Sequence, residues 1–110
     1  MKLKGLPTDA TTWAGMPVFA QAGATGTATA RSRQLGDIQV RLVEYSRDYV
    51  SDQWCPKGHI VYVVDGSLVI EHQDGRTFEI GAGSSYQVGD DDPAPHRVVS
   101  KNGATIFVVD

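Results

Sequence analysis

Residues 53–66 read Gln-Trp-Cys-Pro-Lys-Gly-His-Ile-Val-Tyr-Val-Val-Asp-Gly. This stretch places the lone cysteine of the chain four residues before a histidine, and a run of β-branched and aromatic residues follows. Side chains of one parity on an extended strand point to one face. If the kink at residues 56–58 keeps the register, the inward-facing residues are Gln53, Cys55, His59, Val61 and Val63.

The segment that starts at residue 37 alternates apolar and polar residues. Ile38 and Val40 alternate with Gln39 and Arg41, which predicts a half-buried strand. The segment before it behaves differently, because residues 1–36 show little periodicity.

Turn residues divide the rest of the chain into further strands. Asp65-Gly66 and Asp74-Gly75 each stand between apolar runs, and this pattern predicts β-hairpins. Glycine-containing turns at 81–83, 89–93 and 101–103 separate the later strands. The pattern gives about seven or eight short strands and no long helix, which predicts an all-β sandwich or barrel.

Residues 20–30 are small side chains with two glycines. Their glycine spacing matches no nucleotide-binding motif, so we favour an arm over a phosphate-cradling loop. We therefore divide the chain into an N-terminal arm, residues 1–36, which packs on the barrel or on a partner subunit, and a barrel formed by residues 37–110.

Composition limits the classes of function. The 110 residues fit one domain, and 41% hydrophobic content is enough for a modest core. A net charge of −3 without a Lys/Arg cluster argues against a nucleic-acid partner. No apolar window approaches the ~20 residues of a membrane span, and the N-terminus lacks the apolar stretch of a secretory signal. A single cysteine fits a reducing compartment, so we expect a cytoplasmic protein.

Residues 55–66 and 83–96 together resemble the two motifs of the cupins, small β-barrels of the double-stranded β-helix or jelly-roll kind. Gln53, Cys55 and His59 have the spacing of the two histidines and the glutamate of the first motif. Pro95 and His96 are similar to the end of the second motif. The resemblance implies a cupin jelly-roll barrel over residues 37–110.

A finer resemblance concerns residues 52–59 and the closing phrase Gly-Ala-Thr-Ile-Phe-Val-Val-Asp at 103–110. Both are similar to an uncharacterised subgroup, the cupins with a DHCW motif. This chain has Gln53 where the subgroup has histidine.

Cupins commonly hold one divalent metal inside the barrel, and the resemblance carries its ligands over to Gln53, Cys55, His59 and His96. Thiolate and neutral imidazole bind transition ions well, whereas a carboxamide is a weak ligand. The implied cofactor is therefore a divalent transition metal, namely zinc, iron or nickel, with Gln53 contributing weakly.

Three kinds of function stay open from the sequence. The chain could be an enzyme, such as an oxygenase, an isomerase or a lyase that acts on a small organic acid or sugar. It could be a non-catalytic module that holds a small ligand or a metal, or a structural barrel with a degenerate site. Fold does not decide among these. His59 occupies the usual glutamate position, so no catalytic acid or base is assigned.

Other polar residues receive no site role. We expect His72, beside a turn, to lie on the surface, and Asp90-Asp91-Asp92 to form a solvated loop rather than a cation site. Arg97 and Trp54 have the opposite parity to their ligand neighbours and are expected to face outward.

A homodimer is also expected. Outward-facing apolar residues on a small barrel would be exposed, and such patches mark interfaces. The residues assigned to this patch are Val43, Tyr62, Val64 and Val69.

Overall fold

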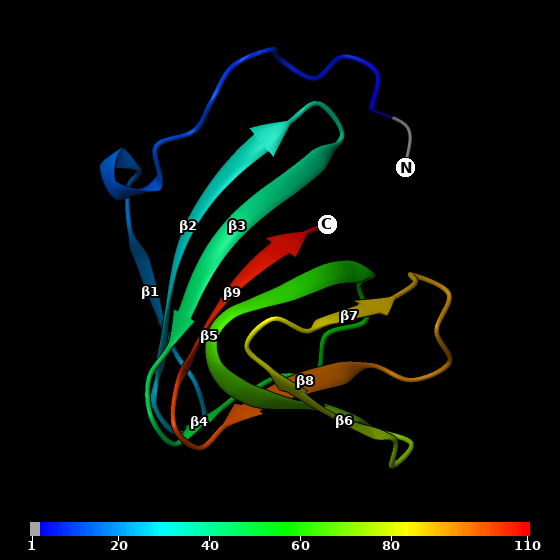
Figure 1. Ribbon diagram of the computed structural model, residues 1–110. Helices are drawn as coiled ribbons and strands as arrows, with labels where there is room; N and C mark the ends of the chain where they lie inside the picture. Colours follow the sequence, from blue (N-terminus) through cyan, green and yellow to red (C-terminus); the bar gives the residue numbers. More distant parts are fainter. Residues whose placement is uncertain (1–2) are drawn as a thin grey trace.

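Nine β-strands and one short 3₁₀ turn form the regular structure of residues 3–110, the part of the chain that a computed structural model describes (Figure 1). The all-β prediction is therefore confirmed. The elements are η1 (Trp13–Gly15), β1 (Phe19–Ala22), β2 (Thr27–Leu35), β3 (Ile38–Tyr45), β4 (Tyr49–Val50), β5 (His59–His72), β6 (Thr77–Gly81), β7 (Ser85–Val88), β8 (His96–Ser100) and β9 (Ala104–Val109).

The strands form two antiparallel sheets that share β5. The order β1-β2-β3-β9-β5-β7 builds the first sheet, and the order β4-β8-β5-β6 builds the second. The first half of β5 pairs with β7 and β9, whereas the second half pairs with β6 and β8. This is the double-stranded arrangement of a jelly roll, as the sequence resemblance implied.

The predicted hairpin at Asp65-Gly66 is wrong, because β5 bends there and continues. The strand continues through these residues, and its register against β9 shifts between Val63 and Asp65, which is a β-bulge. Gly66 has a φ of +76°, and a Cβ there would lie 2.3 Å from the carbonyl oxygen of Gly103. Only glycine fits this close approach, so the Asp-Gly pair turns a corner between sheets instead of reversing the chain.

The other turn predictions are confirmed. The amide of His72 donates to the carbonyl of Arg76 (2.8 Å) and closes the hairpin around Asp74-Gly75. The turn at 81–83 lies against the bend in β5, because Ala82 donates to the carbonyl of Gly66 (3.0 Å). The chain therefore turns at the same place in β5 and in the β6–β7 connection.

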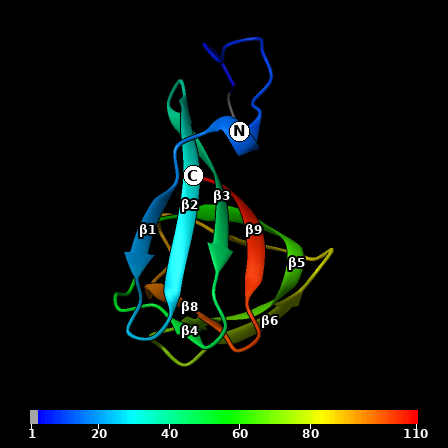
Figure 2. The same ribbon diagram turned by 90° about the vertical axis from the view of Figure 1, so that its left-hand side faces the viewer.

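Residues 19–35 add β1 and β2 to the edge of the first sheet. The turn between them reaches the second sheet, where the amide of Val50 donates to Thr25 (3.1 Å) and the amide of Ala24 donates to Val50 (2.8 Å). Figure 2 shows β1, β2, β3 and β9 side by side as one wall, with β6 and β8 behind it. The two sheets, which are the two walls of the barrel and share β5, are thus also joined by the β1–β2 turn.

The alternation in β3 suggests that the apolar residues Ile38 and Val40 face the interior, but the opposite face of the strand does so. Gln39, Arg41 and Val43 face the interior between the sheets, and Val43 is only 4% exposed. Its assignment to an outer apolar patch was therefore wrong. The outer face of this wall is itself covered, since Trp13 packs edge-to-face on Phe107 with ring centroids 6.2 Å apart. A strand with both faces covered gives no reliable inside-outside signal.

The core lies between the two walls and contains the predicted Val61 (4% exposed) and Val63 (fully buried). Its other buried members are Val43, Leu68, Ile70, Ile80, Tyr86, Ala104, Ile106 and Val108. Within residues 3–110, no helix has the length and hydropathy needed to cross a membrane.

Candidate metal centre

Cys55 and His96 face each other across an isolated antiparallel bridge. The amide of Cys55 donates to the carbonyl of His96 (2.7 Å), and the amide of His96 donates back to Cys55 (2.9 Å). Residues that exchange both backbone hydrogen bonds in this way have their side chains on the same side of the pair. The short segment before β5 therefore brings the thiol next to the imidazole at the start of β8.

His59, the first residue of β5, completes the cluster. The Cys55 Sγ lies 3.4 Å from its Nε2, and its ring meets that of His96 edge-on with centroids 5.0 Å apart. One ligand atom from each of the three residues lies within 4.8 Å of the others. Cys55 and His59 face the same interior although residues 56–58 form a kink between them. The kink is held in place because Gly58 packs closely on the end of β7 and its amide donates to the carboxylate of Asp90 (2.6 Å).

The donor set fits a transition ion. In a tetrahedral zinc site, sulfur at ~2.3 Å and nitrogen at ~2.05 Å from the ion lie about 3.6 Å apart. The observed 3.4 Å between Cys55 Sγ and His59 Nε2 is close to that spacing. Two imidazoles and one thiolate also form a set that zinc, iron and nickel accept.

Asp110 orients His59. Its Oδ2 lies 3.1 Å from the Nδ1 of His59 and also accepts a hydrogen bond from the Arg41 guanidinium at 3.0 Å. A carboxylate only accepts, so the proton of the neutral imidazole sits on Nδ1 and the lone pair of Nε2 points towards Cys55. A carboxylate behind a histidine is the usual partner of a metal-binding imidazole.

Burial keeps both imidazoles in the neutral form that a metal requires. Desolvation lowers the pKa of His59, although the carboxylate of Asp110 opposes this shift. Desolvation, with the neighbouring His59 and His72, lowers the pKa of His96 to about 4. Neutral side chains at physiological pH need lose no proton to coordinate an ion.

A cavity of about 730 Å³ extends from the cluster between the two walls. Its polar lining includes Arg41, Lys57 and Asp110, and its apolar and aromatic lining includes Val108 and Tyr86. The predicted weak ligand, Gln53, is exposed and borders this cavity. Its role as a ligand stays a prediction.

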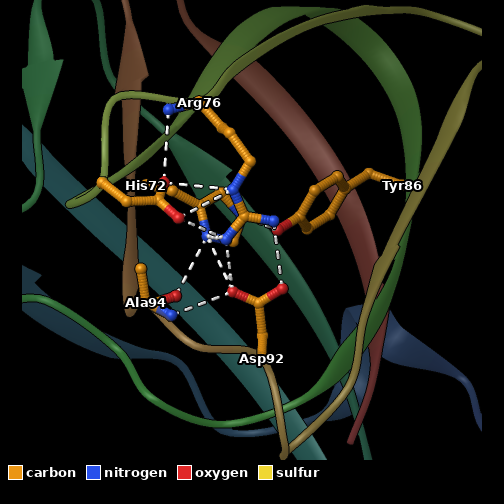
Figure 3. Close-up of polar contacts among 6 residues, drawn as sticks. His72, Arg76, Tyr86, Asp92 and Ala94 are labelled. Atoms are coloured by element: carbon orange, nitrogen blue, oxygen red, sulfur yellow. Dashed lines mark hydrogen bonds and ion pairs between the residues drawn. The ribbon is translucent and has the colours of Figure 1, made fainter.

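His72 is buried, so its assignment to the surface was wrong. Only 4% of it is exposed, and Figure 3 shows its imidazole among Arg76, Tyr86 and Asp92. Its Nδ1 lies 3.0 Å from the carbonyl of Ala94, an acceptor, and therefore carries a proton. In the neutral imidazole, Nε2 then accepts a hydrogen bond from the Tyr86 hydroxyl at 2.7 Å.

This network supports the wall behind the metal ligands. His72 pairs with His96 in the β5–β8 ladder, and Tyr86 borders the cavity. Burial, followed by the charge of Asp92, raises the pKa of Tyr86 to about 12, so its hydroxyl keeps its proton. The network therefore fixes one aromatic wall of the cavity.

In the loop of three aspartates, Asp90 and Asp91 are exposed and Asp92 is half-buried, and two of the three carboxylates are engaged. Asp92 pairs with Arg76 (2.6 Å) and caps the amide of Ala94 (3.1 Å), and the hydrogen bond from Arg76 lowers the pKa of Asp92 to about 2. Asp90 accepts from Gly58, as described above. The loop thus anchors both sides of the site instead of being merely solvated.

Arg97 and Trp54 lie against each other beside the site. The guanidinium of Arg97 lies 4.7 Å from the ring centroid of Trp54 and donates to Glu71 (2.8 Å). Arg97 also borders the cavity, so it is not wholly outside the barrel as its parity suggested.

The fold and the site together define a jelly-roll barrel with a Cys/His/His cluster inside. Solved structures similar to it include ectoine synthase from P. lautus, at a TM-score of 0.73 and 14% identity over 93% of this chain and 76% of that one. Fe(II)-HppE with the alternative substrate (S)-1-HPP matches at a TM-score of 0.73 and 10% identity over 94% of this chain and 60% of that one.

A third similar structure is a sugar phosphate isomerase of the cupin superfamily from Silicibacter pomeroyi. It has a TM-score of 0.63 and 22% identity, over 74% of this chain and 57% of that chain. No family model and no curated protein matches the sequence. The chain has the cupin fold, and its resemblance to the DHCW-motif subgroup stays a prediction.

Three residues of the site carried no signal in the sequence. Arg41 looked like the polar face of an ordinary strand, Asp110 follows the last strand, and His72 stands next to a turn.

Proposed function

We propose that this chain is a small metal-binding protein that holds one zinc, iron or nickel ion on Cys55, His59 and His96 and acts on a small organic acid or sugar. The observation that carries the proposal is the convergence of three ligand atoms within 4.8 Å inside a cavity. When bound, a divalent ion supplies Lewis-acid chemistry to an oxygen of the substrate.

The residues of this chain do the rest. Asp110 holds the proton on Nδ1 of His59 and so keeps Nε2 available. The apolar residues that line part of the cavity lower the local dielectric constant, which strengthens electrostatic interactions beside them. The network around His72 holds Tyr86 in place as part of that wall.

Metal analysis of protein purified without an affinity metal column tests the proposal. We expect close to one transition ion per chain, by elemental analysis of wild-type protein reconstituted with each ion in turn and then dialysed. A protein that retains none of these ions has a degenerate site, and the metal-dependent function would be rejected.

A non-catalytic module for a metal or a small ligand is the alternative. The observation that favours it is the engagement of Asp110, whose Oδ2 is already held by His59 and Arg41. These two contacts already give the carboxylate a positioning role. Retained metal and tight ligand binding without turnover of organic acids or sugars would support the module.

A further inference from the structure

Arg41 lies at the centre of the inner face of β3, where a side chain of a folded barrel is normally apolar. Its neighbours of the same parity are Gln39, Val43 and Tyr45, and all four border the cavity. Its side chain is 29% exposed, and it reaches the metal cluster through Asp110, whose Oδ2 also contacts His59. A permanent positive charge therefore stands beside the candidate metal ligands.

The guanidinium is not fully used by the protein. It has five N–H donors, and Asp110 accepts from one of its terminal nitrogens. Among residues 3–110, its Nε is buried and has no hydrogen-bond partner. Its terminal N–H groups are different, because the side chain is 29% exposed and borders the cavity, so they are the donors that an acceptor from outside the chain could reach.

The charge of the cavity indicates an anion. Three cationic side chains (Arg41, Lys57 and Arg97) and two carboxylates (Asp52 and Asp110) border it. A divalent ion with one thiolate ligand would add a further positive charge. Arg97 is paired with Glu71, so the attraction for an anion comes from Lys57, from the open N–H groups of Arg41 and from the ion when it is bound, inside a protein whose formal charge is −3.

The remaining lining favours an organic acid over a sugar. Apolar side chains line much of the cavity, from Val108, the cross-strand partner of Arg41, to the second sheet, and they are Val61, Leu68, Ile70, Ile106 and Val108. A sugar presents hydroxyl groups on every side and would leave them unpaired there, which is costly. A carboxylate with an apolar tail matches both the guanidinium and the apolar side chains.

We propose that Arg41 binds the carboxylate of a small organic acid whose apolar part extends between the two walls. This inference rests on the proposed function and names the substrate class of the same site. A planar guanidinium matches a carboxylate with two parallel hydrogen bonds, and phosphate is the other anion that it recognises in this way. The apolar side chains that line the cavity favour a carboxylate with an apolar tail over phosphate.

The test measures binding by isothermal titration calorimetry with wild-type protein that has been loaded with zinc and assayed for its metal content. The probes are hexanoate, the neutral hexanamide and inorganic phosphate. We expect hexanoate to bind, and hexanamide and phosphate to bind at least about 10-fold more weakly, since a hydrogen bond to a charged group is worth roughly one to two powers of ten in affinity. Equal binding of hexanamide, or tighter binding of phosphate, would overturn the inference.

Variants test whether Arg41 is the residue that binds hexanoate. Arg41→Gln should keep its metal and lose about 10- to 100-fold in hexanoate affinity. Arg31→Gln, on the outer face of the neighbouring strand β2 beside Glu44, is the matched control and should bind like the wild type. If Arg41→Gln does not fold, Arg41→Lys retains the charge without the paired geometry and should lose part of the affinity. Unchanged hexanoate binding in the folded Arg41 variant would overturn the proposal.

The measured metal content separates this inference from the proposed function. Protein that retains zinc but binds no hexanoate refutes the carboxylate site alone. Protein that retains no metal refutes the metal-binding function, and hexanoate binding that depends on Arg41 in that metal-free protein would still support the carboxylate site.

Discussion

The Nδ1 of His59 lies 3.1 Å from the Oδ2 of Asp110, although 51 positions of sequence separate the two residues. The strand pairing of β5 with β9 creates this contact, because it aligns Ile60 with Val109 and so brings the start of one strand to the end of the other. An orienting carboxylate is thereby supplied from the far end of the chain.

Asp110→Asn is expected to weaken metal binding about 10- to 100-fold while the fold is kept, because a partner behind a metal-binding histidine contributes about that much. Competition with a chelator of known affinity measures the change. Asp52→Asn, another carboxylate that borders the cavity, is the control and should retain wild-type affinity. Equal affinities for the two variants would contradict the orienting role.

Replacement of a ligand should have a larger effect. We expect His59→Ala and His96→Ala to lose near-stoichiometric metal, and Gln53→Ala to retain most of it, because thiolate and imidazole dominate the affinity for such ions. Elemental analysis gives the stoichiometry, and the absorption of the cobalt-loaded protein reports the thiolate. A Gln53→Ala variant as empty as His96→Ala would show that the cluster is incomplete without the amide.

The metal-free protein should lose stability in acid. Burial and two neighbouring histidines lower the pKa of His96 to about 4, whereas a free imidazole has a pKa of ~6.5. Between these values the unfolded chain binds more protons than the folded one, so the free energy of unfolding decreases as the pH falls from ~6.5 to ~4. With allowance for solvent screening, the loss is on the order of 2 kcal/mol.

Urea unfolding of the metal-free protein at several pH values between 4 and 7 measures this loss. His96→Gln removes the titrating group, so its unfolding free energy should depend less on pH over the same window. Parallel curves for the two proteins would assign the acid sensitivity to other groups.

Tyr86→Phe should destabilise the protein without releasing metal. The change removes the hydroxyl that donates to His72 at 2.7 Å and leaves a buried imidazole nitrogen without a donor. An unsatisfied buried acceptor costs about 1–3 kcal/mol. Chemical denaturation measures the cost, and Tyr62→Phe, at a residue that is 47% exposed, should change stability little. Similar losses in both variants would remove any special role for the hydrogen bond to His72.

The homodimer remains a proposal, and it now rests on a smaller patch. Ile60, Tyr62 and Val64 lie on the outer face of β5 and are 46%, 47% and 51% exposed, whereas Val43 belongs to the core. We propose that a second copy covers this face. Sedimentation at micromolar concentration should give a dimer, and Tyr62→Lys combined with Val64→Lys should give a monomer. A monomeric wild type would end the proposal.

Local patterns in the sequence were sufficient where the determinants are local. Alternation placed Val61 and Val63 in the core, and Asp74-Gly75 forms the predicted hairpin. Asp65-Gly66 has the same turn chemistry but bends a continuous strand, because β9 pairs with β5 as far as Gly66 and Gly103 approaches Gly66 closely. That outcome depends on a strand about forty positions away, which no local pattern encodes.

The site, too, was predictable where its residues are close in sequence and not where they are distant. The spacing of Cys55 and His59 was readable, and the structure brings both to His96. The roles of Arg41 and Asp110 arise from the pairing of β3 with β9, and that of His72 from its ladder with β8. Each of these residues also has an ordinary surface interpretation, which only the three-dimensional neighbours can exclude.

The position of β9 has a consequence for how the protein is made. This strand follows the other eight along the chain, yet it lies between β3 and β5 in the middle of the first sheet. During synthesis, the edges of β3 and β5 that face β9 must wait unpaired until it leaves the ribosome, and pairing over such long separations is slow. The nascent chain thus displays its cysteine and histidines before Asp110 arrives to orient one of them. We therefore expect productive metal loading to follow the synthesis of β9 and Asp110.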